Sequence, residues 1–395
     1  MSQTTITLLF LLFAVVSFIL EKIPLGLTAT IVALGLNLTN VLTVKETFAG
    51  YVNSNVILCV GMFVVGQALF ETGMANKIGG IVNKFAKSEK ILIIAIMLIV
   101  GIMSGFLSNT GTAAVLIPVV CGIADESGYS RSRLLMPLVF AAALGGNLSI
   151  IGAPGNLMGV NALEELGLST SFFMYAPIGI PMLICGIIYF IVIGCRLLPD
   201  KKVITEDAPE QTKDFSNVPK WKQAMSLIVL ILVILAMISE KEALKSIDLK
   251  VVLLFGGSLA LASALEKTGA GTLIADKIVG IMGSNPSPIV LLLVIFVVTC
   301  VLTNFMSNTA TTALMVPIAV SLAESLNADP RAVVIATVIA GSCAYATPIG
   351  MPANTMVVGV GGYKFKDYVK SGLPLILVSF VLCMILLPIL YPFYP

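Results

Sequence analysis

Two copies of a Ser-Asn-Thr tripeptide are the residues in this sequence best suited to chemistry. Ser108-Asn109-Thr110 lies in the run LSNTGTAAVLIP, and Ser307-Asn308-Thr309 lies 199 residues later in the run MSNTATTALMVP. Each tripeptide interrupts an apolar stretch with uncharged hydroxyl, amide and backbone groups. If a helix begins at each tripeptide, its free N–H groups and positive dipole end favour a small anion. Ser, Thr and Asn oxygens and unwound carbonyls are also suitable ligands for Na⁺.

A second pair of motifs follows the tripeptides about forty residues further on. Ile151–Met158 reads IGAPGNLM and Ile349–Met356 reads IGMPANTM, so that Pro154 matches Pro352 at a separation of 198. Both motifs break an apolar run with Gly, Pro and Asn. Non-helical backbone at membrane depth is tolerated only where it is buried in protein or lines a cavity. Matched interruptions in two halves therefore point to the binding site of a transporter.

A third match shows that the whole chain is a duplication. ALFETG begins at Ala68 and ALEKTG begins at Ala264, in the same order as the other blocks and at nearly the same separation. We divide the chain into a first repeat (1–198), a polar linker (199–222) and a second repeat (223–395).

The composition predicts an all-α polytopic protein of the lipid bilayer. Hydrophobic residues make up 58% of the 395 residues and charged residues only 11%, against roughly 25% charged in a soluble domain. The net charge of +2 gives no indication of nucleic-acid binding. The absence of histidine, of CxxC spacing and of a nucleophile–base pair argues against metal sites, disulfides and an embedded enzyme. A bacterial inner membrane fits these features.

The motifs resemble those of the divalent anion:sodium symporters of the ion transporter superfamily. The resemblance rests on both SNT tripeptides, on GAPGN and GMPAN, and on the run AYATPIGMPANTMVVGVGGYKFKDYVKSGLPL. It covers roughly the whole chain. It implies an inverted repeat in which two re-entrant hairpins and two broken helices form a mobile transport domain. The resemblance further implies a dimeric scaffold, so a homodimer, and motion of elevator type.

The resemblance also assigns residues to a substrate and a coupling ion. It places the anion between the two tripeptides, beside the loops at Pro154 and Pro352. Sodium would be the coupling ion, with no other cofactor. One Na⁺ would be held by Ser104, Ser108, Asn109 and the loop at Gly152, and a second by Thr303, Asn308 and the loop at Gly350.

Two departures from the family pattern leave alternatives open. Dicarboxylate carriers of the family usually read Thr-Pro-Pro-Asn in these loops, whereas this chain has Ala153 and Met351 at the threonine positions. Dicarboxylate, tricarboxylate and sulfate-like oxyanions all remain candidates. The second repeat also has one apolar run (225–238) where the first has two (6–20 and 25–41), so we expect it to lack one scaffold helix.

Four readings of function follow from these residues. A sodium-coupled symporter of a small divalent anion explains the neutral, oxygen-rich motifs best. An anion exchanger is the second. An Na⁺/H⁺ or metalloid-anion antiporter of the same superfamily would require an intramembrane carboxylate, and the sequence places none clearly in mid-membrane. The missing helix keeps a fourth reading open, an inactive paralogue or non-transporting membrane protein.

Overall fold

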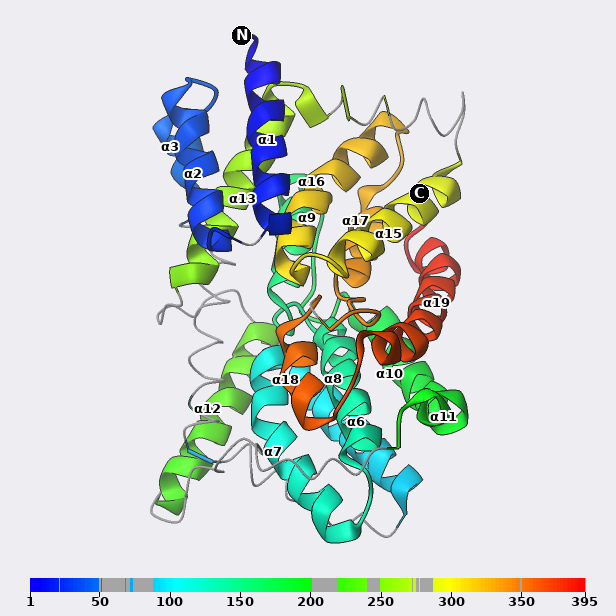
Figure 1. Cartoon of the computed structure of the whole chain (residues 1–395). Coiled ribbons are helices and arrows are strands. Elements are labelled where there is room, and N and C mark those ends of the chain that lie inside the picture. Colours follow the sequence, from blue (N-terminus) through cyan, green and yellow to red (C-terminus); the bar gives the residue numbers. More distant parts are fainter. Residues whose placement is uncertain are drawn as a thin grey trace.

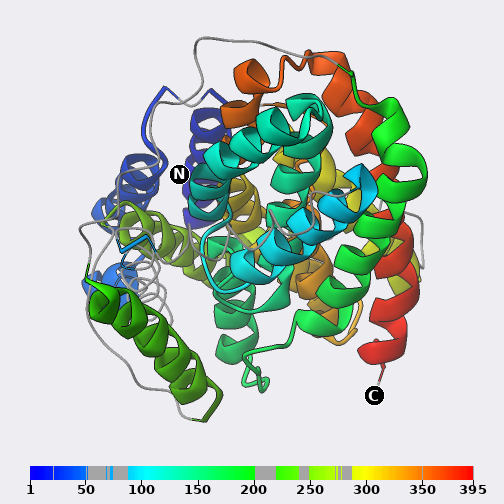
Figure 2. The same ribbon diagram turned by 90° about the horizontal axis from the view of Figure 1, so that it is seen from below.

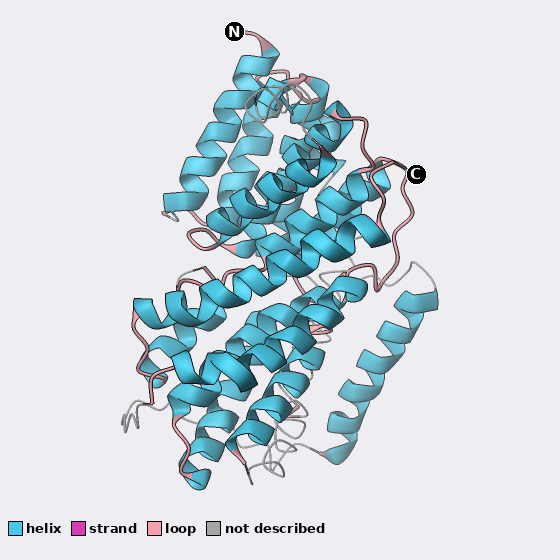
Figure 3. Cartoon of the chain, turned by 90° about the vertical axis from the view of Figure 1, so that its right-hand side faces the viewer, coloured by secondary structure: helices cyan, strands magenta, loops and turns pink. Residues whose placement is uncertain are grey.

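The computed structural model is built from helices joined by short loops (Figure 3). It describes residues 1–20, 22–49, 51, 68, 72–73, 88–200, 219–239, 249–271, 273–274, 277, 287–348 and 350–394. All regular secondary structure in these residues is helical, which confirms the all-α prediction for this part of the chain. Most of the polar linker, half of the ALFETG block and Ile349 lie outside the described residues.

The helices of the first half are α1 (Gln3–Leu20), α2 (Leu25–Leu38), α3 (Val44–Ala49), α6 (Glu89–Ser104), α7 (Asn109–Ser127), α8 (Arg131–Gly145), η3 (Gly146–Leu148), α9 (Pro154–Glu165), α10 (Ala176–Tyr189), η4 (Phe190–Gly194) and α11 (Cys195–Leu197). Those of the second half are α12 (Lys220–Ser239), α13 (Leu249–Lys267), α15 (Pro288–Thr303), α16 (Asn308–Ser325), α17 (Pro330–Gly341), α18 (Pro352–Val360) and α19 (Phe365–Leu390). Helices α6, α7, α8, α9 and α10 of the first half recur in the same order as α15, α16, α17, α18 and α19 of the second.

The two halves exchange one helix with each other. Helices α6, α7 and α8 pack with α18, which belongs to the second half, and form the lower part of the molecule in Figure 1. Helices α15, α16 and α17 pack with α9, which belongs to the first half, and lie in the upper part. The loops that carry the GAPGN and GMPAN motifs therefore lie where the two parts meet.

The first interruption follows a close crossing between α8 and α6. A Cβ atom on Gly145, the last residue of α8, would lie 2.1 Å from the carbonyl oxygen of Gly101 in α6. Only glycine allows this close helix crossing. After η3 the chain is non-helical from Ser149 until Pro154 begins α9, and proline at a first helical position costs no backbone hydrogen bond. Pro352 begins α18 in the same way.

Matched hydrogen bonds hold the two interruptions. Asn156 donates its Nδ2 to the carbonyls of Gly146 and Ser149, at 2.7 and 2.6 Å. Its counterpart Asn354 donates to the carbonyls of Ala344 and Thr347, at 2.7 and 3.0 Å. These amides replace the intrahelical bonds that the break removes, so the unwound backbone remains satisfied inside the protein.

The remaining helices surround this central region. Helices α10 and α19 pack on each other, and α13 packs on α1, α2 and α3, while α12 stands at the edge of the molecule (Figure 2). Three described helices are long and apolar enough to cross a membrane, namely Asn109–Ser127, Ala176–Leu197 and Phe365–Leu390, and four shorter apolar helices accompany them. In the described residues α1 and α2 precede α3, whereas α12 alone precedes α13. Because Lys241–Leu244 lies outside the description, the missing scaffold helix stays a prediction.

Candidate functional site

Both Ser-Asn-Thr tripeptides stand at the start of a helix. Ser108 is the N-cap of α7 and its Oγ accepts a hydrogen bond of 3.1 Å from Gly111 N. Ser307 caps α16 in the same way and accepts a bond of 3.2 Å from Ala310 N. Capping satisfies one of the free N–H groups of a helix start and leaves others available to a ligand.

Most of the expected substrate residues are accessible in an otherwise buried region, whereas Asn109 is buried. Ser108, Thr110, Ser307, Thr309 and Pro154 are half-buried and Pro352 is exposed. The helices that begin at these motifs meet across the two halves, since α18 packs on α7 and α9 packs on α16. The second contact is close: a Cβ atom on Gly155 would lie 2.8 Å from Thr312 Oγ1.

Four oxygens converge around Asn109 in the first half. The side-chain Oδ1 of Asn109 lies 2.6 Å from Ser104 Oγ and 3.1 Å from the carbonyl oxygens of both Ala142 and Gly152. Ser104 Oγ also lies 2.6 Å from the Ala142 carbonyl oxygen. Ser104 is fully buried and Asn109 is 9% exposed. Three of the predicted sodium residues, Ser104, Asn109 and Gly152, thus come together.

The same arrangement occurs around Asn308 in the second half. Its Oδ1 lies 2.9 Å from Thr303 Oγ1, 3.0 Å from the Gly350 carbonyl oxygen and 3.2 Å from that of Gly341. Thr303 Oγ1 lies 2.5 Å from the Gly341 carbonyl oxygen. All three predicted sodium residues of this half, Thr303, Asn308 and Gly350, come together here.

With the amide oxygen facing inward, each cluster has more acceptors than protons. The hydroxyl of Ser104 or Thr303 has one proton but faces two acceptor oxygens, and the amide oxygen faces acceptors only. Turning the amide would place its nitrogen against the same oxygens and relieve the excess. A cation at the centre would relieve it equally and would keep all four oxygens pointing inward. Hydroxyl, amide and backbone oxygens are the ligand set that Na⁺ takes in broken-helix transporters.

Some site atoms depart from the sequence prediction or extend it. Ser108 is predicted to bind both the anion and sodium, and its Oγ in addition accepts the capping hydrogen bond of α7. The carbonyls of Ala142 and Gly341 complete the clusters and were not predicted, because a backbone carbonyl has no signature in residue type. Their only sequence signal is their position in the last turn of α8 and α17, and the Ala142 carbonyl there also accepts a hydrogen bond from Gly146 N.

Two buried hydroxyls at matched positions were also missed. Thr112 and Thr311 lie one turn into α7 and α16, and both are fully buried. Neither Oγ1 has a hydrogen-bond partner in the described part of the protein. Unpaired buried polar groups are uncommon in folded proteins.

A helical membrane protein with two interlocked broken helices, each beside a cluster of oxygens, has the architecture of a secondary transporter. The citrate transporter family model matches residues 15–340 and residues 215–394, so the chain belongs to this family, within the ion transporter superfamily that the motifs predicted.

Individual relatives are similar over different lengths. The uncharacterized transporter YfbS of Escherichia coli (strain K12) is 36% identical over 190 residues, which are 47% of this chain and 31% of that protein. The chain thus spans about a third of that relative. The sodium-dependent dicarboxylate transporter SdcS of Staphylococcus saprophyticus is 25% identical over 437 aligned positions, covering 95% of this chain and 84% of SdcS. The alignment is longer than this chain, so SdcS has segments that are absent here.

A solved structure shares the fold. The Alcanivorax borkumensis YdaH transporter, whose crystal structure is described as having an unusual topology, superposes with a TM-score of 0.61. The match covers 98% of this chain and 99% of that chain at 13% identity, so it supports the fold alone.

Proposed function

We propose that this protein is a sodium-coupled symporter of a small divalent anion. The observation that carries the proposal is the pair of matched oxygen clusters, at Ser104–Asn109 and at Thr303–Asn308, beside the starts of α7 and α16. A multi-pass protein of the inner cell membrane, acting as a homodimer with elevator-type motion, completes the proposal.

The site explains why solute and sodium would depend on each other. The residues around the two tripeptides are neutral, so a divalent anion finds only helix dipoles and hydrogen-bond donors there. Asn109 and Asn308 belong both to a tripeptide and to an oxygen cluster. A cation in each cluster would add positive charge beside the anion and hold the loops at Gly152 and Gly350 in place. The anion would therefore bind well only after sodium.

The proposed substrates are a di- or tricarboxylate or a sulfate-like oxyanion. Two tripeptides could hold the two ends of a carboxylate substrate, and the similarity to the dicarboxylate transporter SdcS also favours such a substrate. The loops themselves add no hydroxyl, because Ala153 and Met351 are apolar and buried. A smaller tetrahedral oxyanion would need fewer donors, and sulfate therefore belongs in the same test.

The test is uptake of labelled succinate, citrate and sulfate into proteoliposomes under an inward Na⁺ gradient. Asn109→Ala and Asn308→Ala each remove one cluster oxygen, and we expect either to lower sodium-dependent uptake at least about tenfold, the effect of losing a hydrogen bond to a charged group. Asn40→Gly is the matched control. It removes the same amide far from the site, and glycine accepts the positive φ of 57° at this position.

The outcomes separate the four readings. Uptake driven by Na⁺ but not by K⁺, and lost in both site variants, would support the symporter. Efflux of loaded anion that requires external anion but no Na⁺ gradient would replace it with an exchanger. Proton movement coupled to Na⁺ would indicate an antiporter. An inactive chain would show none of these while still binding anions.

A further inference from the structure

An apolar groove of about 540 Å³ runs between α15 and α19. Its walls include Phe296, Val301, Phe305, Leu373, Leu377 and Phe380. Phe305, Leu373 and Leu377 are 56%, 53% and 59% exposed. Because α19 is one of the helices able to span a membrane, this groove opens towards acyl chains rather than water. The volume is within the range of small-molecule sites.

The corresponding helices of the first half, α6 and α10, pack directly against each other. A Cβ atom on Gly101 of α6 would lie 2.8 Å from Leu183 of α10, so these two helices touch. In the second half the same positions hold Cys300, which is larger than glycine, and Ile376, and both line the groove.

An aromatic cluster in the first half covers the position that corresponds to the groove of the second half. The ring of Phe106 packs against Phe172 and Phe173, with centroids 6.5 and 6.4 Å apart. The counterpart of Phe106 is the exposed Phe305. The open groove is therefore a feature of the second half, not of the duplicated fold.

One end of the groove is basic. Lys364, Lys366 and Lys370 are exposed at the start of α19, and no ion pair involves them in the part of the chain that the structure describes. Lys366 and Lys370 are one turn apart, and Leu373 and Leu377 continue the same helix face. The acidic residue of this turn, Asp367, is buried and accepts a hydrogen bond from Lys364 N. A cation at a helix N-terminus is repelled by the positive end of the helix dipole. When an anion binds there, the cation and the dipole both attract it.

We propose that the groove binds an anionic phospholipid of the bilayer. Its phosphate would lie between Lys366 and Lys370, and one acyl chain would follow the groove along α15 towards Phe305. An apolar groove with a basic end matches a molecule with an acidic head and an apolar tail, and basic sites between membrane helices bind such head groups. The counterpart stretch of the first half, residues 171–177, contains no lysine.

The lipid would contact the broken helix directly. Ala346 and Thr347 form part of the groove wall. Thr347 Oγ1 donates to the Asn304 carbonyl and accepts from Gly350 N at 3.1 Å. The loop of the second oxygen cluster thus has an acyl chain as its outer neighbour. The binding itself does not depend on the proposed transport.

Fluorescence quenching by brominated lipids tests the proposal. The chain has one tryptophan, Trp221, and replacing it with phenylalanine leaves a silent background. Leu377→Trp then reports on the groove. Ile184→Trp reports on the matched position of α10, which is 49% exposed and has no lysines at its start. Each variant is reconstituted with brominated phosphatidylglycerol or brominated phosphatidylcholine.

We expect the anionic lipid to quench Trp at 377 preferentially, with a relative association constant at least about fivefold above that of the zwitterionic lipid. The ratio at position 184 should be close to one. Lys366→Gln with Lys370→Gln should reduce the ratio at 377 to the same value. Equal ratios at both positions, or a preference that survives the lysine substitutions, would overturn the proposal. Absence of quenching at 377 by either lipid would also overturn it, because protein then covers the groove.

Discussion

The hydroxyl of Thr303 is one of the oxygens of the second cluster. Thr303 lies at the end of α15, is fully buried, and meets both the amide oxygen of Asn308 and the Gly341 carbonyl. Its counterpart Ser104 makes the same two contacts in the first half. The two halves thus need an oxygen at this position but not the methyl group.

We therefore predict that Thr303→Val raises the sodium concentration for half-maximal uptake at least about tenfold, because the cluster loses one ligand of a charged group. Thr303→Ser should remain close to the original protein. Thr299→Val makes the same change one turn earlier, where the buried hydroxyl has no partner among the described residues, and should leave sodium dependence unchanged. Sodium titration of uptake distinguishes the three. Equal effects of the valine substitutions at 303 and 299 would contradict a role in sodium binding.

At the scale of elements, glycine decides how closely the helices cross. Where α6 and α8 cross, Gly145 lies against the backbone of Gly101. Where α10 crosses η3, a Cβ atom on Gly179 would lie 2.1 Å from the Asn147 carbonyl oxygen. A Cβ atom on its counterpart Gly372 would lie 2.2 Å from the Tyr345 carbonyl oxygen. In a membrane these small residues allow van der Waals packing between backbones.

Gly145→Ala should destabilise the protein by about 1–3 kcal/mol, since the new methyl group would force α6 and α8 apart. Gly122→Ala is the control: it lies inside α7 with nothing within 4 Å, so alanine should be neutral or stabilise by up to about 1 kcal/mol. Thermal unfolding in detergent measures both. A lower melting temperature for the 122 variant than for the 145 variant would contradict this account of the crossing.

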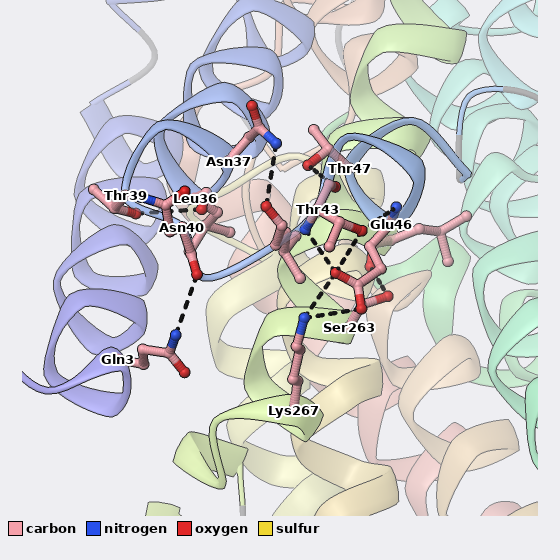
Figure 4. A network of polar contacts seen from close by, with 12 residues as sticks. Gln3, Leu36, Asn37, Thr39, Asn40, Thr43, Glu46, Thr47, Ser263 and Lys267 are labelled. Carbon is pink, nitrogen blue, oxygen red and sulfur yellow. Dashed lines mark hydrogen bonds and ion pairs between the residues drawn. The ribbon is translucent and has the colours of Figure 1, made fainter.

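At the scale of the whole molecule, a polar network joins the two halves of the chain. Lys267 at the end of α13 donates to both carboxylate oxygens of Glu46 in α3, at 2.9 and 2.8 Å (Figure 4). Thr43 N also donates to Glu46, at 2.7 Å. The hydrogen bond from Lys267 and those from Thr43 lower the pKa of Glu46 from 4.5 to about 2. Glu46 lies in the connection after α2, outside the apolar helices.

Because the folded-state pKa is lowered, the stabilisation is present above about pH 4.5 and is lost as pH falls towards 2. We expect Glu46→Gln to lower the melting temperature slightly at pH 7, since the pair is exposed, and to have less effect at about pH 3. Glu324→Gln, an exposed carboxyl without an ion pair among the described residues, should show little change at either pH. A deficit in Glu46→Gln that grows on acidification would contradict the assignment.

Much of the site could be predicted because its signals are local. A polar SNT inside an apolar run starts a helix by capping, and a proline after an extended residue starts one by its fixed φ, so α7, α9, α16 and α18 begin where the motifs indicate. The apolar composition alone predicted that the protein lies in a membrane. The sequence repeat also showed that Ser104 corresponds to Thr303 and Asn109 to Asn308.

Only the tertiary structure decided which carbonyls complete the clusters and which helices face each other. The oxygens of Ala142 and Gly341 are identical in type to every other carbonyl, and only their location at a helix end against Asn109 or Asn308 distinguishes them. The exchange of α9 and α18 between halves and the open groove beside α19 depend on packing between residues far apart in the chain. The sequence determined where helices start and that they lie in a bilayer, because those effects act within a turn or on average composition. Contacts between distant segments depend on how the side chains fill the space between them, and that is settled only in the folded protein.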